Sequence, residues 1–401
     1  MNEYPRLAIL NNLGVGGNRA PLNVLTLTPF YPSKGDDAGG CFIAEPLRAL
    51  AKLGIANSVL AVQPFYRETR QKSQAVTDAQ WLRYFSLPGG LGLPSAGAFL
   101  FARIVGLVRG LQSADRIDLI HAHGPLPCGH AAMLLSAELG IPFVVSVHGL
   151  DAFSTEQVQG RAGTWCRRIS QRIFRSSRRV ICISEHVREK VLEGTGSSCR
   201  TSVVYNAVDS ELFSPPNEPP AAQIILSVGN LIPIKGHDTL IKAFASIKGE
   251  FPELTAEIIG TGPELKKLQK LATQNEVQQR VRFLGRESRA HVADAMRRCT
   301  VFALPSRYEG LGCVYLEAMS AARSVIGCRE QGIAEVIQHG SNGFLVGPEN
   351  EKELAVALSI LLGDPSLRQK LGARARDMIL DGFTLAHQAE RLARIYRECA
   401  G

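Results

Sequence analysis

Several patterns that mark particular protein classes are missing from this sequence of 401 residues. Its nine cysteines form no C-x-x-C pair, and some lie inside apolar runs such as 180–183. They are therefore expected to be reduced thiols and not a disulfide framework, which indicates a reducing compartment and a cytoplasmic protein. No basic segment precedes an apolar run near residue 1, so no signal peptide is predicted.

Two further absences bear on membranes and cofactors. The most apolar stretch, 91–108, is interrupted by Pro94, Arg103 and several glycines, so no membrane-spanning helix is expected there. No G-x-G-x-x-G motif follows a predicted strand with an acidic residue about 20 positions later, which argues against a dinucleotide-dependent oxidoreductase. Hydrophobic residues at 45% are typical of a globular chain, so disorder is not indicated.

The sequence does contain a positive charge that is confined to its first half. Residues 1–208 hold 22 Lys and Arg against 14 Asp and Glu, whereas residues 209–401 hold 23 of each. The whole net charge of +8 therefore lies in the first half. This distribution indicates one positively charged domain beside a neutral one.

Seven of these basic residues are arginines in 161–179, a segment without any acidic residue. Its apolar residues are expected on one side of a helix: Trp165, Ile169, Ile173 and Phe174. A basic amphipathic helix suits an anionic membrane surface or an anionic acceptor, and an outer helix that packs its apolar side on a sheet has the same pattern. No nucleic-acid-binding fold accompanies the arginines, so no nucleic-acid partner is predicted.

Short apolar runs alternate with helical segments along most of the chain. Strands are expected at 22–28, 55–62, 118–123, 142–147, 179–183, 223–228, 255–259, 281–284, 300–304 and 324–327. Runs of this kind, without period-two polarity and separated by helices, are typical of parallel sheets that are covered on both faces. The sequence predicts an α/β protein with two Rossmann-like domains facing across a cleft.

A proline-rich segment separates the two series of strands. It predicts an interdomain linker at 209–222, between an N-terminal domain at 1–208 and a C-terminal domain at 223–385. A last helix near 386–399 has no strand after it.

The strongest group of candidate site residues lies at 306–319. Glu309 and Glu317 bracket a Gly-x-Gly turn that follows a predicted strand. Such glycines let main-chain N–H groups face an anion such as a diphosphate, and two carboxylates in one cleft can accept hydrogen bonds from sugar hydroxyls. A solvated loop acid and a helix-surface ion pair would explain the same spacing.

Other candidates also follow predicted strands. Lys235 follows the strand at 223–228, where a positive charge could bind a phosphate, although an ordinary surface lysine fits the same position. Gly39 and Gly40 open a helix after the first strand.

Three histidines lie in or after buried strands. His148 follows the strand at 142–147 together with Asp151, and this pair could reach a ligand in a cleft. His121 and His123 share one strand face and could be metal ligands, but no third ligand with suitable spacing appears, so no metal site is predicted.

These motifs stand in the order found in the retaining GT-B glycosyltransferases of family 4, which the chain resembles from about residue 22 to 398. The segments that carry the resemblance are 39–40, 118–124, 147–151, 181–187, 203–215, 228–236, 259–265, 309–317 and 335–346. The resemblance implies that 1–208 binds the acceptor, that 223–385 binds a nucleotide sugar, and that 386–401 packs back on the first domain.

The resemblance also implies a role for each candidate. Glu309 would contact hydroxyls of the donor sugar, Glu317 the ribose of its nucleotide, and Lys235 the leaving diphosphate. His148 would contact the sugar near the reacting carbon, with Asp151 beside it. The remaining donor-binding positions are Gly39, Gly40, Asn230, Gly285, Arg286, Leu311, Gly312 and Cys313.

Some positions depart from the family pattern. Asn230 stands where the family often has arginine, so one positive charge near the diphosphate is missing. The usual Ala-Cys-Gly-x-Pro-Val stretch is replaced at 320–325, which loses the glycine and proline and gains Arg323. Gln331 replaces the first residue of a Gly-Gly pair.

Together these observations predict a retaining, metal-independent glycosyltransferase with no cofactor other than its co-substrate. It would move a hexose from a nucleotide-diphosphate sugar to a hydroxyl of a glycan or lipid-linked acceptor. It would lie in the cytoplasm, or on the inner face of the membrane through 161–179. A nucleotide-sugar epimerase, a phosphorylase and a non-catalytic binding protein on the same fold remain open as alternatives.

Overall fold

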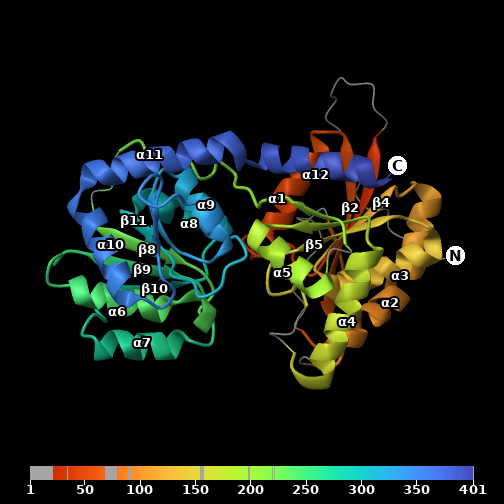
Figure 1. Ribbon diagram of the computed structural model, residues 1–401, viewed down its shortest axis with the longest axis horizontal. Helices are drawn as coiled ribbons and strands as arrows, with labels where there is room; N and C mark the ends of the chain where they lie inside the picture. Colours follow the sequence, from red (N-terminus) through yellow and green to blue (C-terminus); the bar gives the residue numbers. More distant parts are fainter. Residues whose placement is uncertain are drawn as a thin grey trace. The chain divides into compact units, whose positions relative to one another are not determined.

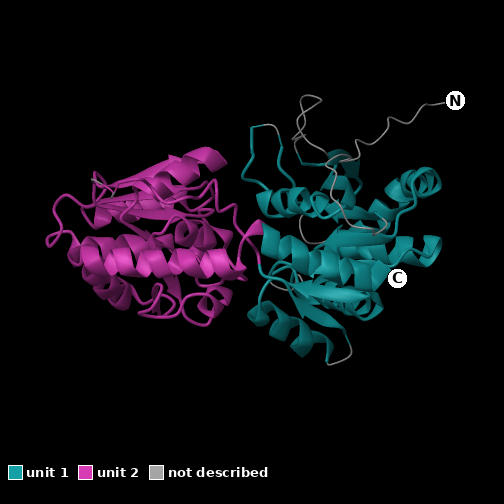
Figure 2. Cartoon of the chain, turned by 90° about the horizontal axis from the view of Figure 1, so that it is seen from above, with its two compact units in different colours: residues 1–205, 386–401 teal, residues 206–385 magenta. Residues whose placement is uncertain are grey.

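The computed structural model describes residues 21–33, 35–67, 79–88, 92–153, 158–196, 199–218, 220 and 222–400, so the N-terminal segment without a predicted signal peptide lies outside it. The chain divides into two compact units (Figure 2). Unit 1 comprises residues 1–205 and 386–401, and unit 2 comprises residues 206–385.

The stretch 209–222, which the sequence predicts as a linker, belongs to unit 2 by this division. The reason is visible at Phe213, which is fully buried and lies under the guanidinium of Arg289, 4.7 Å from the ring centroid. The prolines of the stretch therefore follow a residue that is anchored in the core of unit 2.

Unit 1 is built on a parallel sheet of seven strands in the order β3-β2-β1-β4-β5-β6-β7 (Figure 1). Its strands are β1 Leu22–Thr28, β2 Ile55–Pro64, β3 Ala79–Tyr84, β4 Leu119–His123, β5 Phe143–Val147, β6 Arg179–Cys182 and β7 Thr201–Val203. β4 and β5 are buried along their whole length, as expected for strands covered on both faces.

Helices cover both faces of this sheet. They are α1 Cys41–Ala51, α2 Leu93–Ala114, α3 His130–Leu139, α4 Gly160–Ser176, α5 Glu185–Thr195 and α12 Leu385–Ala400, with the short helix η2 Pro125–Gly129 before α3. The apolar sides of α1 and α12 pack together over β1 and β2, so the last helix of the chain returns to the first unit, as predicted (Figure 1).

From Leu93 to Val108 the apolar stretch lies in one helix, α2, so the expectation that proline and glycine interrupt it was wrong. Pro94 lies in the first turn of α2, where its missing N–H removes no helical hydrogen bond. α2 is the one helix of the described residues that is long and apolar enough to cross a membrane, by length and composition only. Its inner side, which includes Leu100, Ile104 and Val108, is buried in unit 1.

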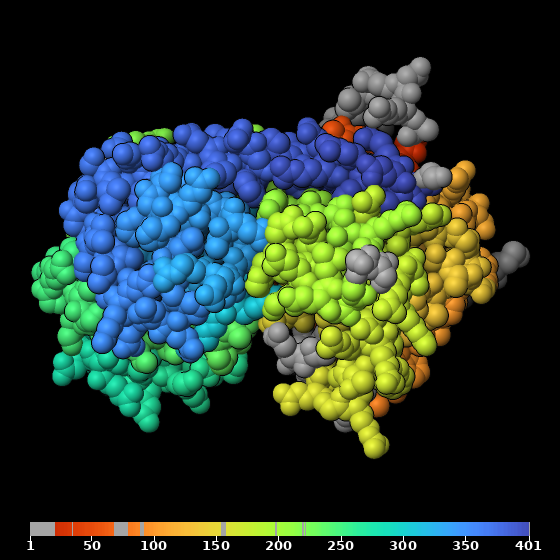
Figure 3. Space-filling view, viewed as in Figure 1, coloured from red at the N-terminus to blue at the C-terminus, as the bar shows by residue number. Residues whose placement is uncertain are grey.

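The basic segment forms α4 at the surface of unit 1 (Figure 3). Ile169, Ile173 and Phe174 are buried against the rest of the unit, whereas Trp165 is 53% exposed among the arginines. The expectation that these four residues share one side was therefore wrong for Trp165. The apolar side of α4 is a core contact and is not available to a bilayer.

Unit 2 has a parallel sheet of six strands in the order β10-β9-β8-β11-β12-β13. They are β8 Ile224–Val228, β9 Thr255–Ile259, β10 Val281–Gly285, β11 Val301–Ala303, β12 Ser324–Cys328 and β13 Phe344–Val346. Its helices are α6 His237–Ile247, α7 Leu265–Gln274, α8 Arg289–Arg298, α9 Cys313–Ser320, α10 Glu351–Gly363 and α11 Pro365–Gly382, with the short turns η3 Pro233–Lys235 and η4 Gly332–Glu335.

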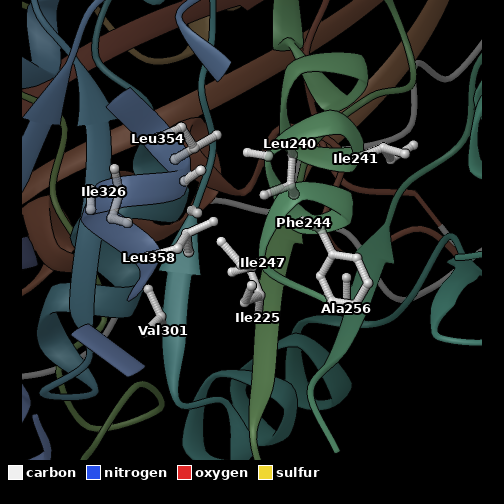
Figure 4. Packing of buried hydrophobic residues seen from close by; sticks show 14 of the residues in the cluster. Ile225, Leu240, Ile241, Phe244, Ile247, Ala256, Val301, Ile326, Leu354 and Leu358 are labelled. Carbon is white, nitrogen blue, oxygen red and sulfur yellow. The ribbon is translucent and has the colours of Figure 1, made fainter. Parts of the chain in front are cut away.

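The core of unit 2 forms where α6, α7 and α10 pack on one face of the sheet. Figure 4 shows Ile225 and Val301 of the sheet beside Phe244 of α6 and Leu358 of α10. The opposite face carries α9, whose Tyr315 ring packs against Phe302 of β11 at 5.5 Å between centroids. The predicted architecture of two α/β domains is therefore confirmed.

Both sheets change direction once. The chain runs outward from β1 to β3 before it returns to β4, and outward from β8 to β10 before it returns to β11. In open α/β sheets, ligands bind outside the carboxyl ends of the strands at such a switch point. The loops after β1, β4, β8 and β11 are therefore the places to look for a site.

The departure at 320–325 has a structural explanation. Ala322 has φ 55°, in the left-handed region, and it stands at the position where the family pattern has glycine. Arg323 is buried and donates to the carbonyls of Cys299 and Ala321, each at 3.1 Å, so it satisfies the ends of α8 and α9. The arginine thus supplies donors to two helix C-termini.

We expect Ala322→Gly to raise the free energy of unfolding by about 1 kcal/mol, because an L-residue in the left-handed region costs about 1–2 kcal/mol that glycine does not. The matched control is Ala321→Gly, since Ala321 has φ −76° and should lose stability. Urea denaturation measures the free energy of unfolding, which should rise in Ala322→Gly and fall in Ala321→Gly. A destabilised Ala322→Gly would contradict the strain at this position.

Candidate functional site

Lys235 and Glu309 form a largely buried ion pair in unit 2. Lys235 ends the turn η3 that follows β8, and Glu309 lies in the loop between β11 and α9. The Nζ of Lys235 donates to Oε2 of Glu309, and the two side chains are 18% and 13% exposed. The structure thus brings together, at the switch point of the sheet, two predicted residues that are 74 positions apart.

The loops that carry this pair are tied to one another. The backbone N–H of Arg307 donates to the carbonyl of Ile234 at 2.7 Å. The side chain of Gln331 accepts from the backbone N–H of Glu309 at 2.8 Å and donates to the carbonyl of Arg307 at 2.9 Å. Gln331, which the sequence marks as a departure from the family pattern, therefore holds the loop that carries Glu309.

The predicted Gly-x-Gly turn leads directly into α9. A Cβ atom at Gly312 would lie 3.1 Å from Cδ of Glu309, so the main chain passes close to this carboxylate. Leu311 is buried, and its carbonyl accepts from the Asn206 side chain at 3.1 Å. Cys313 is the first residue of α9. The N-terminus of α9 therefore lies beside Glu309.

Glu317 lies inside α9 and is only 3% exposed. It accepts a hydrogen bond from Arg289 of α8, which is itself buried and is stacked on Phe213. A buried carboxylate needs such a partner, because leaving one charge of a buried pair uncompensated costs about 3–5 kcal/mol. The ion pair that the spacing allowed therefore exists, but it is internal and not on the helix surface.

Arg289 is not among the site residues predicted from the sequence. A signal was present, because Arg289 directly follows Ser288, the N-cap of α8. The helix dipole disfavours a positive charge in the first turn. A basic residue there indicates a specific acidic partner.

The other predicted donor-binding residues of unit 2 also follow strands. Gly285 ends β10, and its carbonyl accepts from the backbone N–H of Gly260 at 2.7 Å. Arg286 follows it and is exposed, as is Asn230 after β8. All three positions lie at the carboxyl ends of strands on the β8 side of the sheet.

In unit 1, the loop after β1 depends on two glycines. Gly40 has φ 79°, and a Cβ atom there would lie 2.5 Å from the backbone nitrogen of Tyr31. The backbone N–H of Gly39 donates to Asp36 at 2.8 Å. Only glycine at position 40 lets this loop fold back on itself before α1 begins.

His148 and Asp151 lie together after β5. The backbone N–H of His148 donates to Oδ1 of Asp151 at 2.9 Å. Burial lowers the pKa of His148 to about 4 and raises the pKa of Asp151 to about 6. Asp151 therefore holds the turn that carries His148, whose ring packs against Phe42 at 5.2 Å between centroids.

His148 belongs to a stack of three imidazoles. His123 Nδ1 lies 3.1 Å from His148 Nε2, and the rings of His121 and His123 are 4.1 Å apart. His121 is bound on its two sides by Tyr396 of α12 at 2.6 Å and by Ser146 at 2.7 Å. From their positions in the sequence, His121 and His123 were candidates only for metal ligands. Among the described residues, no group of three or more His, Cys, Asp or Glu side chains is placed to hold a metal ion.

Comparison with known families matches both units. The model of the glycosyl transferases group 1 matches residues 209–378, and that of glycosyltransferase family 4 matches residues 42–212. A glycosyltransferase of Methanocaldococcus jannaschii is 30% identical over 270 residues, which cover 67% of this chain and 72% of the relative. The chain belongs to the group 1 glycosyltransferases.

Other relatives cover more of this glycosyltransferase. A D-inositol 3-phosphate glycosyltransferase of Corynebacterium glutamicum is 27% identical, over 92% of this chain and 93% of the relative. Sucrose-phosphate synthase of Thermosynechococcus elongatus has a TM-score of 0.77 at 19% identity and covers 94% of this chain and 98% of its own. HepE of Anabaena, solved with UDP-glucose, has a TM-score of 0.74 at 20% identity. The match covers 94% of this chain and 100% of the HepE chain. The two structures confirm the GT-B fold.

We expect unit 1 of this glycosyltransferase to lose stability as the pH falls from about 7 toward 4. Burial lowers the pKa of His121 to about 3, and burial together with the neighbouring histidines lowers that of His123 well below its usual range. With His148, these imidazoles stay neutral when folded but gain protons near pH 6.5 when unfolded, which costs about 1.4 kcal/mol per pH unit for each. Asp151 acts in the opposite direction, since its raised pKa favours protonation of the folded state.

Urea denaturation at pH 7.5, 6 and 5 measures this slope. Both tryptophans, Trp81 and Trp165, lie in unit 1, so their fluorescence reports its unfolding. His121→Gln, which keeps a polar side chain but does not titrate, should reduce the slope. A free energy of unfolding that stays constant or rises between pH 6.5 and 5 would contradict the neutral stack.

Proposed function

We propose that this chain is a retaining, metal-independent hexosyltransferase. It would transfer a hexose from a nucleotide-diphosphate sugar, bound by unit 2, to a hydroxyl of a glycan or lipid-linked acceptor, bound by unit 1. The observation that carries the proposal is the pair of Lys235 and Glu309 at the switch point of the unit 2 sheet.

Each member of the pair offers what one half of the donor needs. The ammonium group of Lys235 is a compact charge for the diphosphate, and the carboxylate of Glu309 can accept from sugar hydroxyls. Without a ligand the two groups satisfy one another. On binding, the donor would replace both partners, so the ion pair would be exchanged for two contacts to the same molecule.

The charge that develops on the leaving diphosphate would be balanced by Lys235 and by N–H groups at the start of α9. Preorganised donors of this kind stabilise such a charge without reorganisation. No resident metal is needed in this scheme, so we propose that activity persists in the presence of a chelator. His148 of unit 1 would contact the sugar near the reacting carbon.

The relatives support the general class of the reaction. HepE of Anabaena was solved with UDP-glucose, and the relative from C. glutamicum is named for transfer to D-inositol 3-phosphate. We propose a nucleotide-diphosphate sugar as donor on this basis. A cytoplasmic location is proposed from the nine cysteines, all of which are free thiols.

An anionic membrane surface is a further proposed partner. The proposal rests only on the exposed side of α4, and not on the whole amphipathic helix that the sequence predicts. The exposed side of α4 carries Trp165 and arginines, while its other apolar residues pack inward. Attraction of α4 to anionic lipid would therefore be electrostatic and would fall with salt.

Binding of UDP separates the roles of the ion pair. Lys235→Ala should raise the Kd for UDP about 10–100-fold, because a charge-assisted contact is worth about 1.5–3 kcal/mol. Glu309→Gln should leave UDP binding unchanged or tighter, since Lys235 is released from its partner. Isothermal titration measures both, and Lys242→Ala is the control, because Lys242 pairs with Glu351 at the exposed surface. Wild-type affinity for UDP in Lys235→Ala would contradict the donor site.

Turnover tests the reaction itself. A thermal-shift screen with UDP-, GDP- and ADP-sugars selects the donor, and release of nucleoside diphosphate with a panel of acceptors measures transfer. Glu309→Gln and Lys235→Ala should each lower kcat/KM at least about 100-fold. Retention is read from the anomeric configuration of the product. An epimerase would need no acceptor, a phosphorylase would consume inorganic phosphate, and a non-catalytic protein would bind donor without turnover.

The buried pair of Arg289 and Glu317 gives a second test of the donor site. If Arg289 orients Glu317 toward the ribose, wild-type protein should bind UDP more tightly than 2′-deoxy-UDP. Arg289→Met should lower the ratio of the two dissociation constants, that of 2′-deoxy-UDP over that of UDP, toward 1. Arg289→Lys, which keeps the charge, should retain part of the preference for UDP. Titration with both nucleotides measures the ratio, which a merely structural loss would not change. Equal ratios in wild type and Arg289→Met would contradict the positioning role.

A further inference from the structure

Unit 1 exposes a cluster of aromatic side chains at the carboxyl ends of β2 and β3. Phe65 directly follows β2, Phe85 directly follows β3, and Phe99 lies on α2. These side chains are 46%, 49% and 42% exposed. The rings of Phe65 and Phe85 are stacked at 5.5 Å between centroids, and Phe99 meets Phe85 edge-on at 4.9 Å.

Tyr66 extends the cluster, because its ring meets that of Phe65 edge-on at 5.9 Å between centroids, and Leu87 follows Phe85 by two residues. Their side chains are 41% and 52% exposed. Because separate segments contribute to it, this is a built apolar surface and not a set of isolated residues. We call the five residues Phe65, Tyr66, Phe85, Leu87 and Phe99 the aromatic surface. A contiguous exposed surface of this kind marks a site of interaction.

Positive charge borders the aromatic surface. Arg67 follows Tyr66, and the guanidinium of Arg83 donates to the carbonyl of Arg67 at 3.3 Å. Arg103 lies four residues after Phe99 on α2, which places the two on one side of the helix. Arg67 and Arg103 are exposed, and neither forms an ion pair with any residue that the structure describes. A ligand with an anionic group could therefore form ion pairs with Arg67 and Arg103.

We infer that the aromatic surface binds the apolar chain of an amphiphilic acceptor whose anionic group pairs with Arg67 and Arg103. The inference rests on the proposed function and deepens it, because it selects a lipid-linked acceptor over a free glycan. Phenylalanine and leucine side chains offer no hydrogen bonds to sugar hydroxyls, whereas burying each against a hydrocarbon chain is favourable.

The position of the surface favours an acceptor over a bilayer. The backbone N–H of Phe65 donates to the carbonyl of Tyr84 at 2.9 Å, so the aromatic surface begins where β2 and β3 end side by side. Ligands of open α/β sheets bind outside the carboxyl ends of the strands, and this surface lies on that edge, at the two strands next to β1 of the switch point.

Dodecyl phosphate, kept below its micelle concentration, is the probe for this surface, and isothermal titration of the full chain measures its binding. We expect saturable binding that is at least 10-fold tighter than that of dodecyl maltoside, which has the same chain and an uncharged head. Phe85→Ser/Phe99→Ser should weaken it at least 10-fold. Arg67→Gln/Arg103→Gln should remove the preference for dodecyl phosphate. Val356→Ser, at an apolar residue of unit 2 that is 60% exposed, is the control and should change nothing.

Three results would overturn the inference. They are equal binding in wild type and Phe85→Ser/Phe99→Ser, no preference for dodecyl phosphate in wild type, and binding to phosphatidylcholine–phosphatidylglycerol vesicles that needs Phe85 and Phe99 while monomeric dodecyl phosphate does not bind. The last result would assign the surface to a bilayer. On every variant, the fluorescence of Trp81 and Trp165 shows whether unit 1 is folded, and binding of UDP tests the donor site of unit 2. If UDP fails to bind wild type, the proposed function fails; if UDP binds and dodecyl phosphate does not, only this inference fails.

Discussion

Parallel strands all end at the same edge of their sheet, and the candidate site depends on this constraint. Each unit starts its sheet in the middle, builds outward and returns, so the loops after the two central strands meet at one place. In unit 2, the meeting brings Lys235 to Glu309. In unit 1, it places the glycine loop after β1 and the histidines of β4 at neighbouring strand ends.

Charge balance is the second requirement, because several ionised groups are buried. Glu317 is balanced by Arg289, whose other face is covered by Phe213, so the start of unit 2 is packed onto the residue that orients a proposed ribose contact. Arg323 forms no ion pair with an acidic residue in the part of the chain that the structure describes, and instead donates to two helix ends. In both cases the guanidinium serves well because its planar fork offers several donors in fixed directions.

The structure explains two of the departures from the family pattern. Gln331 makes two hydrogen bonds to the loop that carries Glu309, and Arg323 satisfies helix carbonyls near the strained Ala322. The replacement of arginine by Asn230, which is exposed after β8, has no structural explanation. The departures therefore differ in kind: two are compensated by new contacts, and one is not.

The amino-acid sequence alone predicted the fold class, the bounds of β1, and the presence of Lys235, Glu309 and Glu317 in the same half of the molecule. These features are local or periodic, so apolar runs and glycine turns report them. It missed β3 and α2, because Pro94 and the glycines of α2 read as breaks although the proline lies in the first turn. The packing of the folded chain determined which polar groups pair, as Arg289 with Glu317 in an ion pair and Tyr396 with His121 in a hydrogen bond. It also decided which apolar residues face outward, because such contacts join residues far apart in the chain and depend on how the helices pack.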